Sequence, residues 1–162
     1  MKKMLVVLMI VVMVIPTISV SAKEVATLPE FDVYFNGNKV ESESREYPLL
    51  VYKDITYFPM TYFYSRHLGI VTEWDGETNT LAISKKNINS ILTAYNSDSK
   101  NQKENDVSIC NFNIIVNGKT IDNKTEPYPL LTFRDVTYFP LTWRFALINL
   151  VGNTLLTTKT DL

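Results

Sequence analysis

The stretch that decides the fold is Tyr47-Pro-Leu-Leu-Val-Tyr-Lys-Asp-Ile-Thr-Tyr-Phe-Pro59, because the chain repeats it almost unchanged. It returns 81 positions later as Tyr128-Pro-Leu-Leu-Thr-Phe-Arg-Asp-Val-Thr-Tyr-Phe-Pro140, and Asn36-Gly37 returns at the same distance as Asn117-Gly118. Two copies this similar predict two structural units built alike. The shared positions are aromatic, aliphatic, proline and turn-forming residues, which favours folding or surface recognition over catalysis.

Residues 1–22 have the composition of an export signal. Lys2 and Lys3 precede the apolar run Met4–Ile15, and Val20-Ser21-Ala22 supplies small residues at the expected cleavage point. The apolar run would span only about 18 Å as a helix, whereas a bilayer core is about 30 Å thick. We expect a secreted or cell-surface associated protein with no stable membrane insertion after cleavage. An uncleaved membrane anchor is the alternative.

The charge of the chain makes nucleic acid an unexpected partner, and its cysteine content excludes an intrachain disulfide. Without Lys2 and Lys3, 14 basic residues remain against 17 acidic ones, so we expect no nucleic acid as a partner, because phosphate binding draws on dense basic patches. Cys110 is the one cysteine of the sequence, so no intrachain disulfide can form. It lies in residues 107–115, an apolar-rich strand candidate, which favours a small buried side chain over a reactive thiol.

The first copy, residues 23–86, has the pattern of several strands and one short helix. Alternation and turn dipeptides predict strand pairs around Asn36-Gly37 and Lys53-Asp54. The apolar spacing then becomes helical, with Thr61 as the N-cap. A last hairpin is expected to turn at Asp75-Gly76. We therefore predict an α+β fold, in which a small antiparallel β-sheet curls around one helix.

The second copy, residues 107–162, is expected to be incomplete. The run Asn96–Asp106 contains no apolar residue, and we interpret it as part of a solvated linker, residues 87–106. The strand pattern then returns, but no counterpart of the hairpin at Asp75-Gly76 follows it. The fold is thus predicted as a tandem repeat whose second copy is short of strands. We expect the first copy to fold by itself and the second to be unstable alone.

The order of these motifs resembles the copper amine oxidase-like N-terminal domain, also called the stalk domain, of exported Gram-positive bacterial proteins. The resemblance covers residues 31–84 well and residues 112–147 in part. It is carried by Thr-Tyr-Phe-Pro in both copies and by Trp74-Asp-Gly-Glu-Thr78 in the first. It implies a small antiparallel sheet curled around one helix. Thr61 and Thr142 stand where that family often has arginine.

The family name does not predict oxidase chemistry for this chain. The resemblance implies that oxidase copper is held by several histidines in a separate catalytic domain, whereas His67 is the one histidine of this sequence. We expect a structural role for His67, no metal, no cofactor and no enzymatic activity. Glu73 and Asp75 flank Trp74 as a candidate acid/base pair, but the turn at Asp75 explains that residue without catalysis.

The sequence has more aromatic residues than we expect a small domain to bury in its core. We expect Phe58, Phe63, Trp74 and Phe139 in the core. A candidate exposed patch for ligand binding consists of Tyr52, Tyr57, Tyr62, Phe133, Tyr138 and Trp143. The predicted function is that of an exported, non-catalytic binding or spacer module at the cell envelope, whose partner is a cell-wall polymer or another envelope protein. The alternative is a carbohydrate or peptidoglycan-binding module that uses the aromatic patch.

Overall fold

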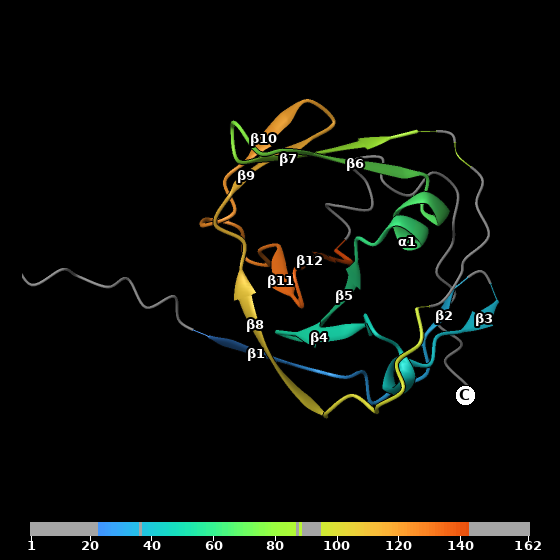
Figure 1. Cartoon of the computed structure of the whole chain (residues 1–162). Helices are drawn as coiled ribbons and strands as arrows, with labels where there is room; N and C mark the ends of the chain where they lie inside the picture. Colours follow the sequence, from blue (N-terminus) through green and yellow to red (C-terminus); the bar gives the residue numbers. More distant parts are fainter. Residues whose placement is uncertain (1–22, 36, 87, 89–94, 143–162) are drawn as a thin grey trace, which may run out of the picture.

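Both copies of the repeat contribute strands to one closed barrel. The computed structural model describes residues 23–35, 37–86, 88 and 95–142. Six antiparallel strands close in the order β1-β4-β5-β12-β11-β8 (Figure 1). They are β1 (Glu24–Thr27), β4 (Leu50–Tyr52), β5 (Ile55–Pro59), β8 (Glu104–Ile109), β11 (Leu131–Phe133) and β12 (Val136–Pro140).

The two halves of the barrel are related by the same offset as the sequence repeat. Phe58 in β5 pairs with Phe139 in β12, its own counterpart 81 positions later. Across the opposite seam, Val25 in β1 pairs with Asp106 in β8, which is again 81 positions later. An antiparallel pair of equivalent residues lies on an approximate two-fold axis. The two copies therefore face each other across the barrel.

The tight turns of the barrel follow from the dipeptides that repeat. Lys53 and Asp54 join β4 to β5 with φ of 49° and 62°, and Arg134 and Asp135 join β11 to β12 with φ of 49° and 61°. Two successive residues with positive φ form the hairpin turn whose twist matches that of the flanking strands. The predicted turn at Lys53-Asp54 and its repeat are confirmed.

A second sheet lies on the barrel and mixes strands of the two copies. Its order is β10 (Lys119–Ile121), β9 (Asn113–Val116), β7 (Thr80–Lys85) and β6 (Ile70–Asp75). The hairpin β6–β7 comes from the first copy, and its strand β7 runs parallel to β9 of the second copy. Figure 1 shows this sheet above the barrel, with the hairpin of β2 (Tyr34–Phe35) and β3 (Asn38–Lys39) on another side.

The repeat places β2 and β3 at the positions of β9 and β10, yet the two hairpins differ in their neighbours. In the part of the chain that the structure describes, β2–β3 is a sheet of two strands, whereas β9–β10 belongs to a sheet of four. We expected the second copy to be short of strands. The first copy supplies its last hairpin to the second, so among the described strands the shorter sheet belongs to the first copy.

The α-helix that the described residues contain is short, and it is capped as predicted. α1 spans Tyr62–His67, and the Thr61 hydroxyl accepts a hydrogen bond from the backbone N–H of Tyr64. Gly69 follows the helix with a φ of 71°, a conformation that suits glycine after a helix C-terminus. The Tyr64 side chain is buried against the barrel beside Leu49. A short 3-10 turn, η1 (Ser42–Ser44), precedes β4.

The predicted α+β fold, with a sheet curled around one helix, is wrong. The described residues form a mainly β structure, in which a core of nine buried residues fills the barrel and α1 packs outside it. Strand edges explain the difference. Each copy alone would leave the backbone groups of two edges unpaired, whereas the pairs β1–β8 and β5–β12 satisfy all of them by closing the barrel.

The end of the expected linker is also packed against the barrel. β8 begins at Glu104, and Lys103 accepts a backbone hydrogen bond from Leu28. The Asn101 amide donates to the carbonyls of Ser42 and Arg45, at 2.8 Å and 2.7 Å. Lys100, Gln102 and Lys103 are exposed, so the segment is in contact with solvent while it is held to the barrel. Polar side chains that satisfy backbone carbonyls can order a segment that has no apolar residue.

Candidate functional site

Four of the six aromatic residues that we expected on an exposed patch lie inside the barrel. Tyr52, Tyr57, Phe133 and Tyr138 are all buried and pack in one cluster. They lie on β4, β5, β11 and β12 at positions that point inward, so closing the barrel encloses them. The predicted exposure of these four residues is wrong. Tyr62 is exposed, and Trp143 lies outside the described residues.

The buried tyrosines are structural groups in this barrel. The Tyr57 hydroxyl donates a hydrogen bond to the carbonyl of Pro129 at 3.0 Å, whereas the Tyr138 hydroxyl has no partner among the residues described. Burial raises the pKa of Tyr57 and of Tyr138, because an ionised phenolate is costly away from water. Both phenols therefore stay neutral and cannot act as bases near neutral pH.

The core predictions for the other aromatic residues have mixed outcomes. Phe58 and Phe139 are buried, as predicted, and Phe63 is half-buried. Trp74 is 55% exposed, so its predicted place in the core is wrong. Its indole lies edge-on against the ring of Phe112, with 5.2 Å between centroids, on the outer face of the β6–β7 hairpin.

The titratable groups outside the barrel interior have ordinary structural roles. Asp75 accepts hydrogen bonds from the Thr78 hydroxyl at 2.6 Å and from the backbone N–H of Glu77 at 2.9 Å, and these bonds lower its pKa. Cys110 is buried, as predicted, and burial raises the pKa of its thiol to about 11. Among the described residues, no three His, Cys, Asp or Glu side chains are grouped as a metal site.

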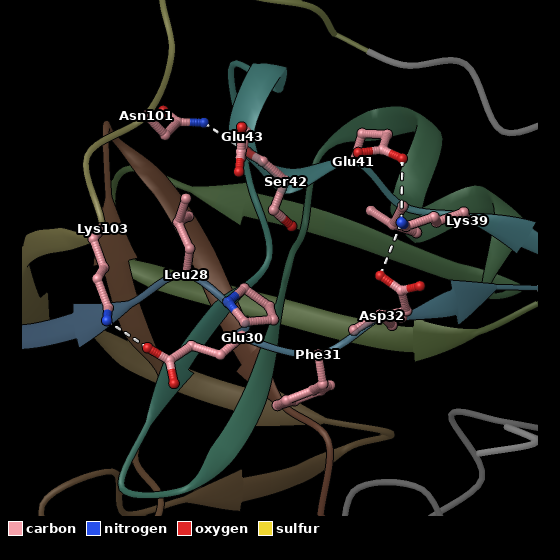
Figure 2. Close-up of a pocket in the computed structure, with 13 residues that line it drawn as sticks. Leu28, Glu30, Phe31, Asp32, Lys39, Glu41, Ser42, Glu43, Asn101 and Lys103 are labelled. Carbon is pink, nitrogen blue, oxygen red and sulfur yellow. Dashed lines mark hydrogen bonds and ion pairs between the residues drawn. The ribbon is translucent and has the colours of Figure 1, made fainter. Parts of the chain in front are cut away.

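A cleft of about 550 Å³ lies where the β2–β3 hairpin meets the barrel. Its walls come from the segment between β1 and β2, from β3 and the turn after it, and from the residues before β8 (Figure 2). The lining residues are Leu28, Pro29, Glu30, Phe31, Asp32, Val33, Lys39, Val40, Glu41, Ser42, Glu43, Asn101 and Lys103.

Ion pairs form the rim of this cleft. Lys39 Nζ lies 2.8 Å from Asp32 Oδ1 and 3.8 Å from Glu41 Oε1, and Lys103 forms an ion pair with Glu30 (Figure 2). Hydrogen bonding and the charge of Lys103 lower the pKa of Glu30, and Glu30 in turn raises the pKa of Lys103. Glu30 and Lys103 therefore stay charged near neutral pH. The lining of the cleft has more carboxylates than ammonium groups.

The floor of the cleft is apolar, and part of it is open to solvent. Leu28 and Val40 are buried, and Val33 is half-buried. Phe31 is 58% exposed, and Tyr34 on the adjoining strand is exposed as well. An apolar floor with a charged rim is the usual composition of a binding surface, because the floor supplies affinity and the rim orients the ligand.

The equivalent place in the second copy is filled by the chain itself. Phe112, the counterpart of Phe31, lies against Trp74, and Ile114, the counterpart of Val33, is fully buried. Leu81 and Ile83 of β7 belong to the same buried cluster as Ile114. The cleft is therefore the uncovered equivalent of a site that the β6–β7 hairpin covers on the other side of the barrel.

The sequence analysis missed the cleft residues as functional candidates. The charged run Glu41–Glu46 reads as a solvated segment, and no motif of known chemistry falls on residues 28–43. The repeat offset was the signal that could have found them. The offset makes Phe112 the counterpart of Phe31 and Ile114 the counterpart of Val33. Since the sequence contains one clear copy of the last hairpin, that hairpin can cover only one of the two sites.

No family model, curated protein or solved structure matches this chain. The resemblance to the stalk domain therefore stays a prediction from the motifs. Within the described ranges, no helix is both long and apolar enough to cross a membrane. The candidate site rests on the geometry of this molecule alone.

Proposed function

We propose that this chain is an exported, non-catalytic module that binds another molecule of the cell envelope through the cleft beside β2. The observation that carries the proposal is the unequal covering of two equivalent hairpins. The β6–β7 hairpin buries the apolar face of β9, whereas Phe31 and Val33 at the equivalent place remain open or partly open. A surface that the fold buries elsewhere with its own strand is well suited to a partner.

Export and envelope location rest on the character of residues 1–22. The partner of this proposal is a cell-wall polymer or another envelope protein, and the excess of carboxylates along the cleft favours a partner with basic groups. The non-catalytic role is supported by the ionisation of one cleft carboxylate, Glu30. A general acid or base works best with a pKa near the working pH, whereas the pKa of Glu30 is lowered by Lys103.

Carbohydrate binding is the second candidate, and two exposed aromatic residues favour it. Tyr62 is 59% exposed on α1, with the Arg66 guanidinium 4.6 Å from its ring centroid, and Trp74 is 55% exposed on β6. Amphipathic rings of this kind can stack on a ligand while their polar groups stay hydrated. This candidate now depends on Tyr62 and Trp74, because the barrel tyrosines are enclosed.

A retention experiment separates the two candidates. The purified chain is applied to isolated cell-wall polymer and to separated envelope proteins, and the bound fraction is measured for the wild type, Phe31→Ala and Tyr62→Ala. These two residues are matched controls, since they are 58% and 59% exposed. The cleft proposal expects Phe31→Ala to reduce retention and Tyr62→Ala to leave it unchanged. The reverse result supports the carbohydrate candidate, and no retention of any variant contradicts both.

A further inference from the structure

One backbone edge of β2 has no strand beside it in the described structure. Val33 accepts a hydrogen bond from the backbone N–H of Val40 at 2.9 Å, and β2 pairs with β3 on that same side. The backbone groups of successive residues in a strand point to opposite edges. The N–H and C=O groups of Asp32 and Tyr34 therefore point away from β3, toward the open edge.

In the second copy, the equivalent edge of β9 holds a parallel strand. The backbone N–H of Asn113 donates to Asn79 at 2.9 Å, and that of Asn117 donates to Ile83 at 2.8 Å. The pairing runs from Thr80 opposite Asn113 to Ile83 opposite Val116. The offset of 81 makes Asp32 the counterpart of Asn113 and Tyr34 the counterpart of Ile115. The backbone groups that hold β7 in one copy are therefore those that face no described strand in the other.

The side chains beside the open edge also resemble those that receive β7. Ile114, Ile121, Leu130 and Phe139 form the apolar seat on which Leu81 and Ile83 are buried. Their counterparts are Val33, Val40, Leu49 and Phe58, which pack together in one cluster. This second seat has valines in place of the two isoleucines, and its cluster also contains Tyr64 of α1. Val40, Leu49 and Phe58 are buried there, whereas Val33 is half-buried, and no described strand lies over it.

We propose that the open edge of β2 accepts an extended segment of another polypeptide, added parallel to β2 in the place that β7 occupies on β9. Backbone hydrogen bonds to Asp32 and Tyr34 would fix the strand, and apolar side chains at alternate positions would cover the half-buried Val33. At least one basic residue would complement the excess of carboxylates in the cleft. This inference rests on the proposed function and specifies its ligand as a polypeptide strand.

A peptide taken from the sequence of β7 can serve as the probe for strand addition at β2. The peptide Asn79-Thr-Leu-Ala-Ile-Ser-Lys-Lys86 copies the strand that binds the equivalent edge, and it carries two lysines. In β7, the carbonyls of Asn79 and Ile83 accept from β9, and the N–H of Lys85 donates to the Asn117 side chain. Odd-numbered residues of β7 therefore face β9, and the backbone N–H groups of Leu81 and Ile83 should face β2 in the proposed complex.

Two N-methylated peptides make a matched pair for this geometry. One carries methyl groups on the backbone nitrogens of Leu81 and Ile83, and the other on those of Ala82 and Ser84. Binding of each labelled peptide to the purified chain is followed by fluorescence anisotropy, and the contacted amides are identified by NMR. We expect the first modification to weaken binding by about tenfold or more and the second by less than about threefold, because only the first removes hydrogen bonds to β2.

Several results would overturn this proposal. Absence of saturable binding by the parent peptide would do so, and so would an equal loss for both N-methylated peptides. Slow exchange of the Tyr34 amide in the free chain would show that the chain or a second copy already covers the edge. If the peptide fails while Phe31→Ala still abolishes retention on the envelope fraction, the cleft function stands and the strand geometry fails. If retention is also absent, the proposed function itself fails.

Discussion

The hairpins β9–β10 and β2–β3 hold equivalent positions in the repeat, yet among the described strands only β9–β10 has a further hairpin beside it. The β6–β7 hairpin of the first copy lies along β9 and buries Ile114 completely. Val33, its counterpart in β2, stays half-buried beside an open strand edge. The difference shows that a copy of this repeat does not complete its own sheet. The last hairpin of one copy completes the other copy instead.

Because a hairpin of the first copy covers a strand of the second, the two copies depend on each other for stability. Strand β7 of the first copy needs β9 of the second to bury Leu81 and Ile83. The barrel adds a second dependence, since β5 pairs with β12 and β1 pairs with β8. Strand pairing thus crosses the boundary between the copies at three places. Predictions that compare equivalent positions can test this arrangement directly.

The largest effect is expected from separating the two copies. A chain of residues 23–86 would lose the partners of β1, β5 and β7, leaving three strand edges unpaired and Leu81 exposed. From the sequence we expected the first copy to fold by itself. From these pairings we instead expect the fragment to lack a cooperative thermal transition, because small units with little buried surface are marginal even when their edges are paired. Circular dichroism and amide exchange measure the result, with the intact chain as the control. A cooperative melt of residues 23–86 alone would show that the first copy completes itself after all.

Shortening the side chain to alanine at two equivalent core positions should lower the free energy of unfolding by different amounts. Ile114→Ala should reduce the free energy of unfolding by about 2–5 kcal/mol, because the side chain is fully buried under β7 and its removal leaves a cavity. Val33→Ala, at the uncovered position, should cost clearly less, on the order of 1 kcal/mol or below, because the half-buried site loses less contact. Denaturant unfolding measures both variants. Equal costs would mean that Val33 is covered in solution.

Local structure could be predicted from the sequence, since its causes are local. The hairpin dipeptides Lys53-Asp54 and Asn117-Gly118 have the positive φ values that such turns require, and the Thr61 hydroxyl caps α1. Barrel closure could not be predicted in this way. The seam between β1 and β8 joins residues about 80 positions apart, and the two strands share too little sequence for the repeat to show. Their pairing depends on the edges left open by the rest of the fold.

The candidate site was predictable only in part for the same reason. The missing second hairpin was visible in the sequence, but which sheet it left short depended on the crossing of β7 to β9. The prediction of an exposed aromatic patch failed because alternation along a strand does not show which face of the strand is buried. Closing the barrel buried Tyr57 and Tyr138, whereas Trp74 and Phe31 remained exposed on the outer faces.

A smaller difference is expected between the two equivalent barrel tyrosines. Tyr57→Phe removes a buried hydrogen bond to the carbonyl of Pro129 and should cost about 1 kcal/mol of stability. Tyr138→Phe should be close to neutral or stabilising, because the Tyr138 hydroxyl is buried without a partner among the described residues. Thermal and denaturant unfolding of the matched pair measures the difference. A larger cost for Tyr138→Phe would indicate an ordered water or another partner at its hydroxyl.

The smallest effects concern two exposed carboxylates, one on each side of this comparison. Asp75 lies in the β6–β7 turn, where the Thr78 hydroxyl and two backbone N–H groups lower its pKa below the ordinary value of 3.8. Glu30 lies at the open cleft, where hydrogen bonding and charge from Lys103 lower its pKa below 4.5. Each carboxylate is more acidic folded than unfolded. Its stabilising effect is therefore present above the unfolded pKa and is lost as the pH falls through the folded pKa.

Salt should separate the two carboxylates. High ionic strength screens an exposed ion pair but leaves hydrogen bonds from neutral donors largely intact. NMR titration at low and high salt should therefore show the pKa of Glu30 returning toward its ordinary value, while the pKa of Asp75 stays low. Lys103→Met should have the effect of salt on Glu30 and none on Asp75. If the pKa of Glu30 changes neither with salt nor with Lys103→Met, the charge of Lys103 does not lower that pKa. A basic residue of a partner could then not take over the role of Lys103 beside Glu30.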